Sequence, residues 1–304
     1  MPWDFAAELT RWGPAAGDTP VSPAAARAYC ARVTRAHYEN FTVASALLPR
    51  RLVPHFHAVY AYCRWADDLA DETAGGAATL ALLDWWRGEL HACYAGEPRH
   101  PVMVALRETV RRFAIPAEPF LDLLLAFEQD QRVKQYATFA DLLGYCRNSA
   151  NPVGRLVLHL FECYSPVRAA LSDEVCTGLQ LANFWQDVAR DYDVGRVYLP
   201  AEDRARFGYA NADLAARRFT PAFADLLRFE VTRTREFFDR GSALLPLLPR
   251  PARVDVDLFV RGGRAVLSSI ERAGFDVWTR RPVVSKQRKL GLLFSALWSN
   301  LTAG

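Results

Sequence analysis

The chain has 304 residues and a mass of 34.1 kDa, enough for one large domain or two of ordinary size. Hydrophobic residues make up 51% of the sequence and charged residues 23%, a composition that excludes a disordered or fibrous protein. Lys and Arg outnumber Asp and Glu by only 37 to 34, and this balance excludes a dedicated nucleic-acid-binding protein, in which clustered basic charge is expected.

Helical signals follow one another along the first half of the chain. Ser22 and Pro23 fit the N-cap and the first position of a helix. Apolar residues in 79–94 recur at spacings of three and four, and Gly96 follows as a stop signal. Thr138 is placed to cap the helix that follows it.

The second half continues the helical pattern. Ser172 is expected to open a long helix that ends near Gly195, and Pro221 opens another. We find no alternating run of β-branched residues, no Asn-Gly or Asp-Gly hairpin turn, and no internal repeat. The sequence therefore predicts a single all-α domain over 1–304, with an N-terminal extension (1–22) and a basic and apolar C-terminal helix (285–304).

A polar face marks the helix expected over residues 59–72. The spacings are close to i, i+4, i+7 and i+11, which places on one face Tyr60, Arg64, Asp67, Asp68 and Asp71. Aspartates four residues apart repel each other by roughly 0.2–0.5 kcal/mol when exposed. If buried and unpaired they would cost far more.

A second polar stripe lies on the helix expected over residues 178–193. It consists of Gln180, Asn183, Asp187 and Asp191, while the other faces of this helix are almost wholly apolar. A helix that is apolar on nearly all sides is buried. Its paired carboxylates therefore need a cation in front of them.

Divalent metal ions meet this need. Ligands that are all oxygen favour Mg²⁺ or Mn²⁺ over zinc. Mg²⁺ typically binds one or two carboxylates and completes its shell with water and substrate phosphate oxygens. The two stripes predict a diphosphate site with Mg²⁺, or alternatively Mn²⁺, held by Asp67, Asp71, Asp187 and Asp191.

Three segments resemble the squalene/phytoene synthase family, the head-to-head isoprenyl diphosphate synthases. They are YAYCRWADDLAD (60–71), YCRNSANPVGRLVLHLF (145–161) and QLANFWQDVARDYDVGRVYLP (180–200). The resemblance runs from about His37 to Trp278. It implies a single-domain, all-α isoprenoid synthase fold, in which a central cavity lies between two aspartate-bearing helices that hold Mg²⁺ and diphosphate.

Carried over residue by residue, the resemblance also implies roles for individual side chains. The catalytic set comprises five aspartates and a tyrosine near the reacting carbons: Asp67, Asp68, Asp71, Asp187, Asp191 and Tyr145. The expected substrate-binding residues are His37, Tyr38, Asn40, Phe41, Tyr60, Arg64, Asn151, Gln180, Asn183 and Arg196. Pairing with a motif aspartate is the alternative role for Arg196. Phe41, Phe184 and Trp185 are candidates to line the pocket and stabilise a carbocation.

Three departures distinguish this chain from the coupling enzymes of the family. The segment 37–41 reads His-Tyr-Glu-Asn-Phe in place of His-Ser-x-Ser-Phe, and Gln186 replaces the usual arginine. Where Val-Ala-Gly is usual, the chain has Ser149-Ala150-Asn151-Pro152 ahead of Val153-Gly154. These changes are similar to the hydroxysqualene synthase branch, which ionises presqualene diphosphate and quenches the cation with water. The resemblance thus implies a Mg²⁺-dependent, diphosphate-releasing enzyme of squalene and hopanoid biosynthesis that needs no nicotinamide cofactor.

Other functions remain as alternatives. The first is head-to-head prenyl transfer that yields presqualene diphosphate, squalene or phytoene. A class I cyclase or a chain-elongating synthase is disfavoured, because the chain has no second DDxxD motif and no Asn-Ser-Glu pattern. The intact aspartate pairs disfavour a non-enzymatic assembly factor of the same fold.

The sequence also carries expectations about compartment and partners. Six cysteines form no CxxC pair, which is typical of free thiols in a reducing compartment. The N-terminus has no basic segment ahead of an apolar run, so we expect no signal peptide and a cytoplasmic protein. The expected partner is a small isoprenoid diphosphate and not a nucleic acid. Peripheral contact with a membrane and with neighbouring squalene-pathway enzymes is a further expectation.

The C-terminal helix generates a prediction about membranes. Ser285-Lys286-Gln287-Arg288-Lys289 precedes the apolar run 290–298, a pattern typical of an interfacial helix. We expect a chain that ends at Val284 to stay folded and to lose binding to liposomes in a flotation assay. Loss of folding would instead show that the helix docks on the protein core.

Overall fold

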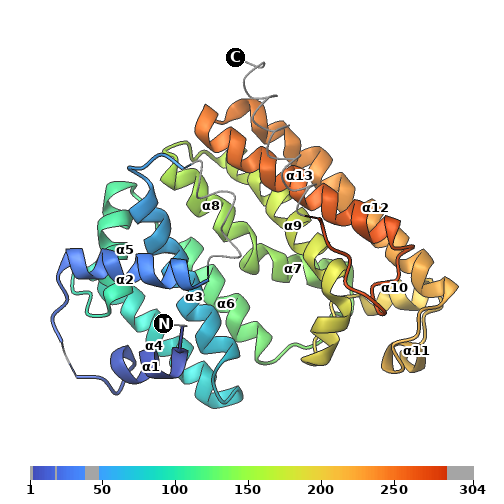
Figure 1. The fold of residues 1–304 in the computed structure, drawn as a ribbon, viewed down its shortest axis with the longest axis horizontal. Coiled ribbons are helices and arrows are strands. Elements are labelled where there is room, and N and C mark those ends of the chain that lie inside the picture. The colour runs from blue at the N-terminus through green and yellow to red at the C-terminus, as the bar shows by residue number, and fades with distance from the viewer. Residues whose placement is uncertain (1–2, 18, 38–47, 286–304) are drawn as a thin grey trace. The chain divides into compact units, whose positions relative to one another are not determined.

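The secondary structure is helical throughout the described part of the chain. The structure is a computed structural model that describes residues 3–17, 19–37 and 48–285. Within these ranges the helices are accompanied only by an isolated bridge between Gln135 and Val197, which confirms the all-α prediction (Figure 1). No helix in these ranges is long and apolar enough to cross a membrane. The predicted site residues Tyr38, Asn40 and Phe41, and the C-terminal helix beyond Ser285, lie outside the described residues.

The helices pack as two compact units. Unit 1 comprises Met1–Arg132 and Arg155–Tyr164, and unit 2 comprises Val133–Gly154 and Ser165–Gly304. This division of contacts does not test whether the units fold separately. The prediction of a single domain therefore stays a prediction.

Unit 1 is built around the first aspartate-bearing helix. Its helices are α1 (Phe5–Trp12), α2 (Pro23–Ala36), α3 (Val53–Asp71), α4 (Gly76–Ala95), α5 (Pro101–Arg112) and α6 (Glu118–Asp130). Helix α8 (Asn151–Leu160) begins in unit 2 and ends in unit 1. The central helix α3 packs against α2, α4, α5 and α6. Its fully buried Trp65 stacks on Trp86 of α4, with ring centroids 5.4 Å apart.

Helix α1 of the N-terminal segment packs in the core of unit 1. Phe5 of α1 is buried, and its ring lies 5.1 Å from Trp65. The Tyr29 hydroxyl donates a hydrogen bond to Glu8 of α1 at 2.9 Å and accepts one from Trp65 Nε1 at 3.1 Å. These contacts tie α1 to both α2 and α3.

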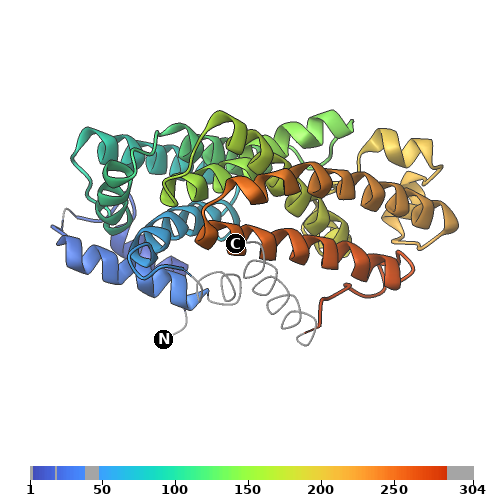
Figure 2. The same ribbon diagram turned by 90° about the horizontal axis from the view of Figure 1, so that it is seen from above.

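Unit 2 is built around the second aspartate-bearing helix. Its helices are α7 (Phe139–Ser149), α9 (Pro166–Asp193), α10 (Ala201–Arg206), α11 (Asn211–Ala215), α12 (Pro221–Gly241), the 3₁₀ helix η2 (Ser242–Leu247) and α13 (Arg250–Arg272). The 28-residue α9 packs against α7, α12 and α13. Helices α12 and α13 lie side by side in both ribbon views (Figure 2).

Most local helix signals are confirmed. The Ser22 hydroxyl accepts a hydrogen bond from the Ala25 amide, and Thr138 forms a complete capping box. Gly96 ends α4 in the left-handed conformation. The predicted start at Ser172 is wrong, because Ser165 caps α9 about two turns earlier. Ser172 is instead a buried residue within the helix.

The packing of α13 on its neighbours generates a prediction from two adjacent glycines. A Cβ atom on Gly263 would lie 2.3 Å from Cζ of the buried Phe238, whereas one on Gly262 would meet nothing within 4 Å. We expect Gly263→Ala to lower the free energy of unfolding by about 1–3 kcal/mol through overpacking. We expect Gly262→Ala to raise it by about 0.5–1 kcal/mol, because alanine favours the helix. Urea denaturation measures both, and effects of the same sign would contradict this packing.

Candidate functional site

The polar face of α3 contains four of the predicted site residues. Tyr60, Arg64 and Asp67 are partly exposed, and Asp71 is exposed. Asp68 differs from the expectation because it is fully buried. One residue further along a helix is a rotation of about 100°, which turns Asp68 away from the face that carries Asp67.

The buried Asp68 carboxylate is paired inside unit 1. Arg64 forms an ion pair with its Oδ1 atom, and Trp3 Nε1 donates a hydrogen bond to Oδ2 at 2.9 Å. Burial raises the pKa of Asp68 to about 7, and the charge of Arg64 opposes this shift. Arg64 also reaches Asp67 at 3.0 Å and Glu72 at 3.1 Å. Asp68 therefore fixes the arginine that lies among the exposed carboxylates.

Trp3 brings a further predicted residue to this group. Its ring packs edge-on against His37 at a centroid distance of 5.5 Å, while His37 Nδ1 lies 3.0 Å from the Val33 carbonyl oxygen. Trp3 thus contacts both His37 and Asp68. Sequence patterns did not identify Trp3, since its role depends on how α1 packs against α2 and α3.

The second stripe runs along α9 in unit 2. Gln180, Asp187 and Asp191 are partly exposed and Asn183 is exposed, whereas the flanking residues Leu181, Ala182, Phe184, Trp185 and Val188 are buried. The side chains of the stripe are accordingly the accessible groups of an otherwise packed helix.

Both carboxylate oxygens of Asp187 accept hydrogen bonds from other side chains. Asn183 Nδ2 donates to Oδ2 at 3.0 Å. Arg281, which follows α13, donates from Nη2 to Oδ2 at 2.9 Å and from Nε to Oδ1. The hydrogen bond to Asp187 is the main reason that the pKa of Arg281 is raised. Arg281 was not among the predicted site residues.

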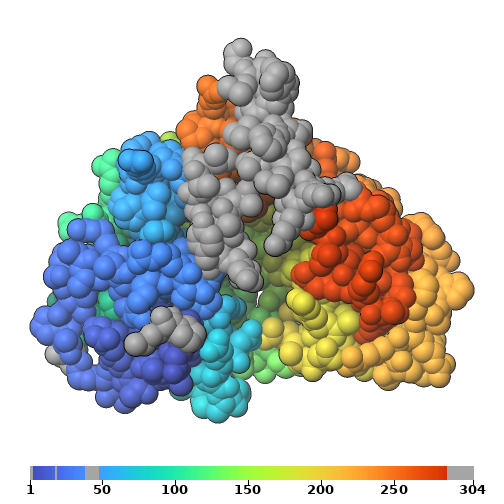
Figure 3. Space-filling view, in the orientation of Figure 1, coloured from blue at the N-terminus to red at the C-terminus, as the bar shows by residue number. Residues whose placement is uncertain are grey.

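Gln186 joins the same group of contacts. Arg281 Nη2 donates to Gln186 Oε1 at 2.9 Å, and Gln186 Nε2 donates to the Pro282 carbonyl oxygen at 2.5 Å. The space-filling view shows the red segment after α13 beside the yellow end of α9 (Figure 3). The residue that departs from the family pattern is therefore the one that binds this segment.

Four buried aromatic rings gather beside the stripe in unit 2: Tyr136, Tyr145, Phe184 and Tyr198. Phe184 and Tyr198 stack with centroids 3.7 Å apart, and Tyr145 lies 6.1 Å and 5.9 Å from them. Ring faces of this kind can stabilise a cation. Trp185 packs edge-on against Phe184 at a centroid distance of 6.4 Å, and its Nε1 atom donates a hydrogen bond to the Thr234 hydroxyl at 2.8 Å.

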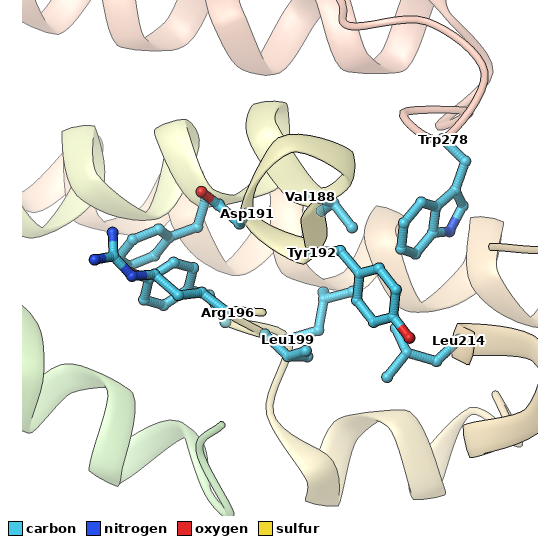
Figure 4. A pocket seen from close by; sticks show the side chains of 10 residues that line it. Val188, Asp191, Tyr192, Arg196, Leu199, Leu214 and Trp278 are labelled. Carbon is cyan, nitrogen blue, oxygen red and sulfur yellow. The ribbon is translucent and has the colours of Figure 1, made fainter. Parts of the chain in front are cut away.

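A small pocket of about 10 Å³ lies at the end of α9. Figure 4 shows Asp191 and Arg196 toward one end of it, and Tyr192, Leu214 and Trp278 toward the other. Its volume is below the roughly 300–1,000 Å³ typical of small-molecule sites. This pocket alone is therefore too small for a long isoprenoid chain.

Asn151 is a buried polar side chain at the start of α8. The Thr177 hydroxyl of α9 donates to its Oδ1 atom at 3.0 Å. This hydrogen bond fixes the orientation of the amide group. Both residues belong to unit 2, as does the aromatic cluster.

The donor atoms of the two stripes suit a magnesium ion. Each helix carries two carboxylates one turn apart, Asp67 and Asp71 on α3 and Asp187 and Asp191 on α9. Among residues 3–17, 19–37 and 48–285, no group of three or more His, Cys, Asp and Glu side chains forms a metal-binding cluster. Because Mg²⁺ uses one or two carboxylates and takes further oxygens from water and substrate, pairs of this kind are sufficient.

Comparison with known proteins finds relatives that all belong to one family. The profile of the squalene/phytoene synthase family matches residues 34–288. The chain is 30% identical to phytoene synthase from Arthrospira platensis over 90% of this chain and 92% of that protein. It is 29% identical to 15-cis-phytoene synthase from Synechococcus elongatus over 86% of this chain and 89% of that protein.

Solved structures agree with the expected isoprenoid synthase fold. Squalene synthase HpnC from Alicyclobacillus acidocaldarius is 45% identical, with a TM-score of 0.81 over 85% of this chain and 98% of that one. A dehydrosqualene synthase in complex with a ligand is 27% identical, with a TM-score of 0.82 over 93% of this chain and 98% of that one.

The burial of Asp68 predicts that the stability of the protein depends on pH. A carboxyl whose pKa is raised by folding binds its proton more tightly in the folded chain, so its contribution to stability falls as the pH rises from about 4 to 7. Asp68→Asn removes this titration. We therefore expect the stability of this variant relative to the parent to improve by roughly 2 kcal/mol between pH 5 and pH 8.

Urea denaturation in metal-free buffer at both pH values measures this difference. The control is Asp71→Asn, which removes an exposed carboxylate from the same helix. Its stability relative to the parent should change less between pH 5 and pH 8. Equal pH dependence for the two variants would contradict the assignment.

Proposed function

The chain belongs to the squalene/phytoene synthase family, and from this membership we propose that it ionises presqualene diphosphate and quenches the cation with water. The products are hydroxysqualene and inorganic diphosphate. Sequence identity supports a C30 substrate over a C40 one. The chain is 45% identical to the squalene synthase HpnC but only about 30% identical to the phytoene synthases.

The carboxylates of both stripes serve the departure of diphosphate. Asp67 and Asp71 on α3, with Asp187 and Asp191 on α9, would hold Mg²⁺, which supplies neutralising charge for the leaving diphosphate when bound. Arg64 adds a fixed positive charge on the first stripe, because Asp68 and Asp67 both bind it. Gln180, Asn183 and Tyr60 provide further polar groups beside these carboxylates.

The aromatic cluster of unit 2 is suited to stabilise the carbocation that forms during the reaction. Once the carbon–oxygen bond to diphosphate breaks, its electron pair leaves with the diphosphate and a cyclopropylcarbinyl cation remains. The faces of Tyr145, Phe184 and Tyr198 can stabilise such a cation without supplying a nucleophile. Their burial also limits access of bulk water.

The buried amide of Asn151 is the observation that favours quenching of the cation by water over coupling of two prenyl diphosphates. Its orientation is fixed by Thr177, and it lies where the coupling enzymes of the family usually have Val-Ala-Gly. A fixed buried amide can hold one water molecule by hydrogen bonds. The water oxygen bonds to the rearranged cation and its proton passes to the diphosphate, so the reaction needs no reductant and no nicotinamide.

Direct coupling of two prenyl diphosphates is the second candidate. It is favoured by the similarity to phytoene synthases, which extends over 86–90% of this chain. Coupling would use the same four metal carboxylates. The two functions differ in substrate and in the source of the atom that quenches the cation.

The substrate and the source of the product oxygen distinguish them. We expect purified protein, presqualene diphosphate and Mg²⁺ to give hydroxysqualene without NADPH. Run in ¹⁸O-labelled water, the product should carry one labelled oxygen by mass spectrometry. Squalene formed only when NADPH is added, or a C30 or C40 product made directly from C15 or C20 diphosphates, would contradict the proposal.

Asp71→Asn is the matched inactive variant for this assay. Its side chain is exposed, so we expect an intact fold. Loss of electrostatic stabilisation at a leaving group typically lowers turnover by a factor of about 10² to 10³. Near-native turnover by this variant would exclude a role for the first stripe.

We also propose contact with a membrane surface and with neighbouring squalene-pathway enzymes. Both rest on the sequence of residues 285–304 and on the water-insoluble product.

A further inference from the structure

The Asp187 carboxylate is largely occupied by donors of the chain itself. Its side chain is 12% exposed, and both of its oxygens accept from the chain's own donors. Arg281 occupies Oδ1 and Oδ2 together as a planar fork, which is the strongest common form of carboxylate recognition. A metal ion that binds Asp187 must replace at least one of these hydrogen bonds.

A metal ion and Arg281 also exclude each other by charge. Arg281 supplies the positive charge that balances Asp187, and the nearby Asp191 adds to its attraction. A divalent cation on the same carboxylates would repel the guanidinium group at close range. The two cations therefore compete for one set of oxygens.

Gln186 completes the contact between Arg281 and α9. Its amide accepts from Arg281 through Oε1 and donates to the Pro282 carbonyl through Nε2. An arginine at position 186, which is usual in the family, has donors but no acceptor and would repel Arg281. The amide satisfies both partners, and it is itself buried.

The rest of the segment is held independently of these contacts. Trp278 packs against Tyr192 at 5.8 Å and against Phe223 at 5.7 Å. Release of Arg281 would therefore free residues 279–285 while the preceding turn stays attached. The peptide bond between Arg280 and Arg281 lies in this stretch.

We propose that Gln186 and Arg281 form a latch that holds the segment after α13 on the second stripe, and that metal binding at Asp187 opens it. The inference rests on the proposed metal site. Gln186 is a positioning residue in this device, because it holds Arg281 and the Pro282 carbonyl in the closed arrangement.

Mn²⁺ binding tests the competition directly. Electron paramagnetic resonance measures free Mn²⁺ during titration of the full-length protein without substrate. We expect Arg281→Gln to bind Mn²⁺ about tenfold more tightly than the parent, since a charge-assisted fork no longer competes. Gln186→Met, which keeps the side-chain volume, should tighten binding by a smaller factor.

Arg280→Gln is the matched control. It removes the same charge from the neighbouring residue, and Arg280 makes no hydrogen bond or ion pair within the described ranges. We expect its Mn²⁺ affinity to stay within about twofold of the parent, because exposed charges are screened by salt. Equal tightening by Arg280→Gln and Arg281→Gln would indicate a general charge effect and overturn the latch.

Asp187→Asn separates failure of the latch from failure of the proposed function. If Asp187→Asn binds Mn²⁺ as well as the parent does, the metal site itself is wrong. If Asp187→Asn loses binding while Arg281→Gln equals the parent, the metal site stands and the latch is overturned.

Limited trypsin digestion of the unmutated protein gives a second measurement. Trypsin can cut after Arg280 but not between Arg281 and Pro282. We expect cleavage after Arg280 to be faster with Mg²⁺ than with EDTA, relative to cleavage at other arginines. Gln186→Met should show the faster cleavage even in EDTA. Equal rates with Mg²⁺ and EDTA would overturn the proposal even if a variant failed to fold.

Discussion

The repulsion between two carboxylates one turn apart on a packed helix is the constraint on which each of the two stripes depends. Helix α3 carries Asp67 and Asp71, and α9 carries Asp187 and Asp191. The other faces of each helix form the core of its unit, so the two carboxylates of a pair stay on the same face, one turn apart. Each pair therefore needs positive charge nearby.

The two units supply that charge in different ways. In unit 1 the cation is Arg64, which lies on the same helix as its partners at spacings of three and four residues. The buried Asp68 and Trp3 hold it in place. In unit 2 the cation is Arg281, which lies 94 residues from Asp187 in sequence and follows another helix. The first cation is supplied within one helix, whereas the second is supplied by a distant segment of the chain.

A small number of polar side chains distinguishes this chain within a fold that hosts several reactions. The same architecture accommodates a squalene synthase and a dehydrosqualene synthase, so the fold alone does not determine the product. Asn151 and Gln186 are both buried and both hydrogen-bonded to specific partners. Burial without such partners would destabilise the protein, so each requires a matching group on another element.

The sequence by itself determined what depends on neighbouring residues. Capping by Ser22 and Thr138 and the stop at Gly96 follow from hydrogen bonds and backbone conformations within one turn. The two carboxylate stripes follow from helical spacing alone. These local rules predicted the all-α fold and most candidate site residues that the structure describes.

Tertiary structure decided what depends on contacts between distant segments. Asp68 differs from Asp67 by one residue, and only the packing of α3 against its neighbours places one inside and the other at the surface. Trp3 reaches Asp68 across 65 residues because α1 packs in unit 1. Arg281 reaches Asp187 because α13 returns the chain to α9. No periodic pattern encodes these pairings, since each joins segments whose separation in sequence bears no relation to their distance in space.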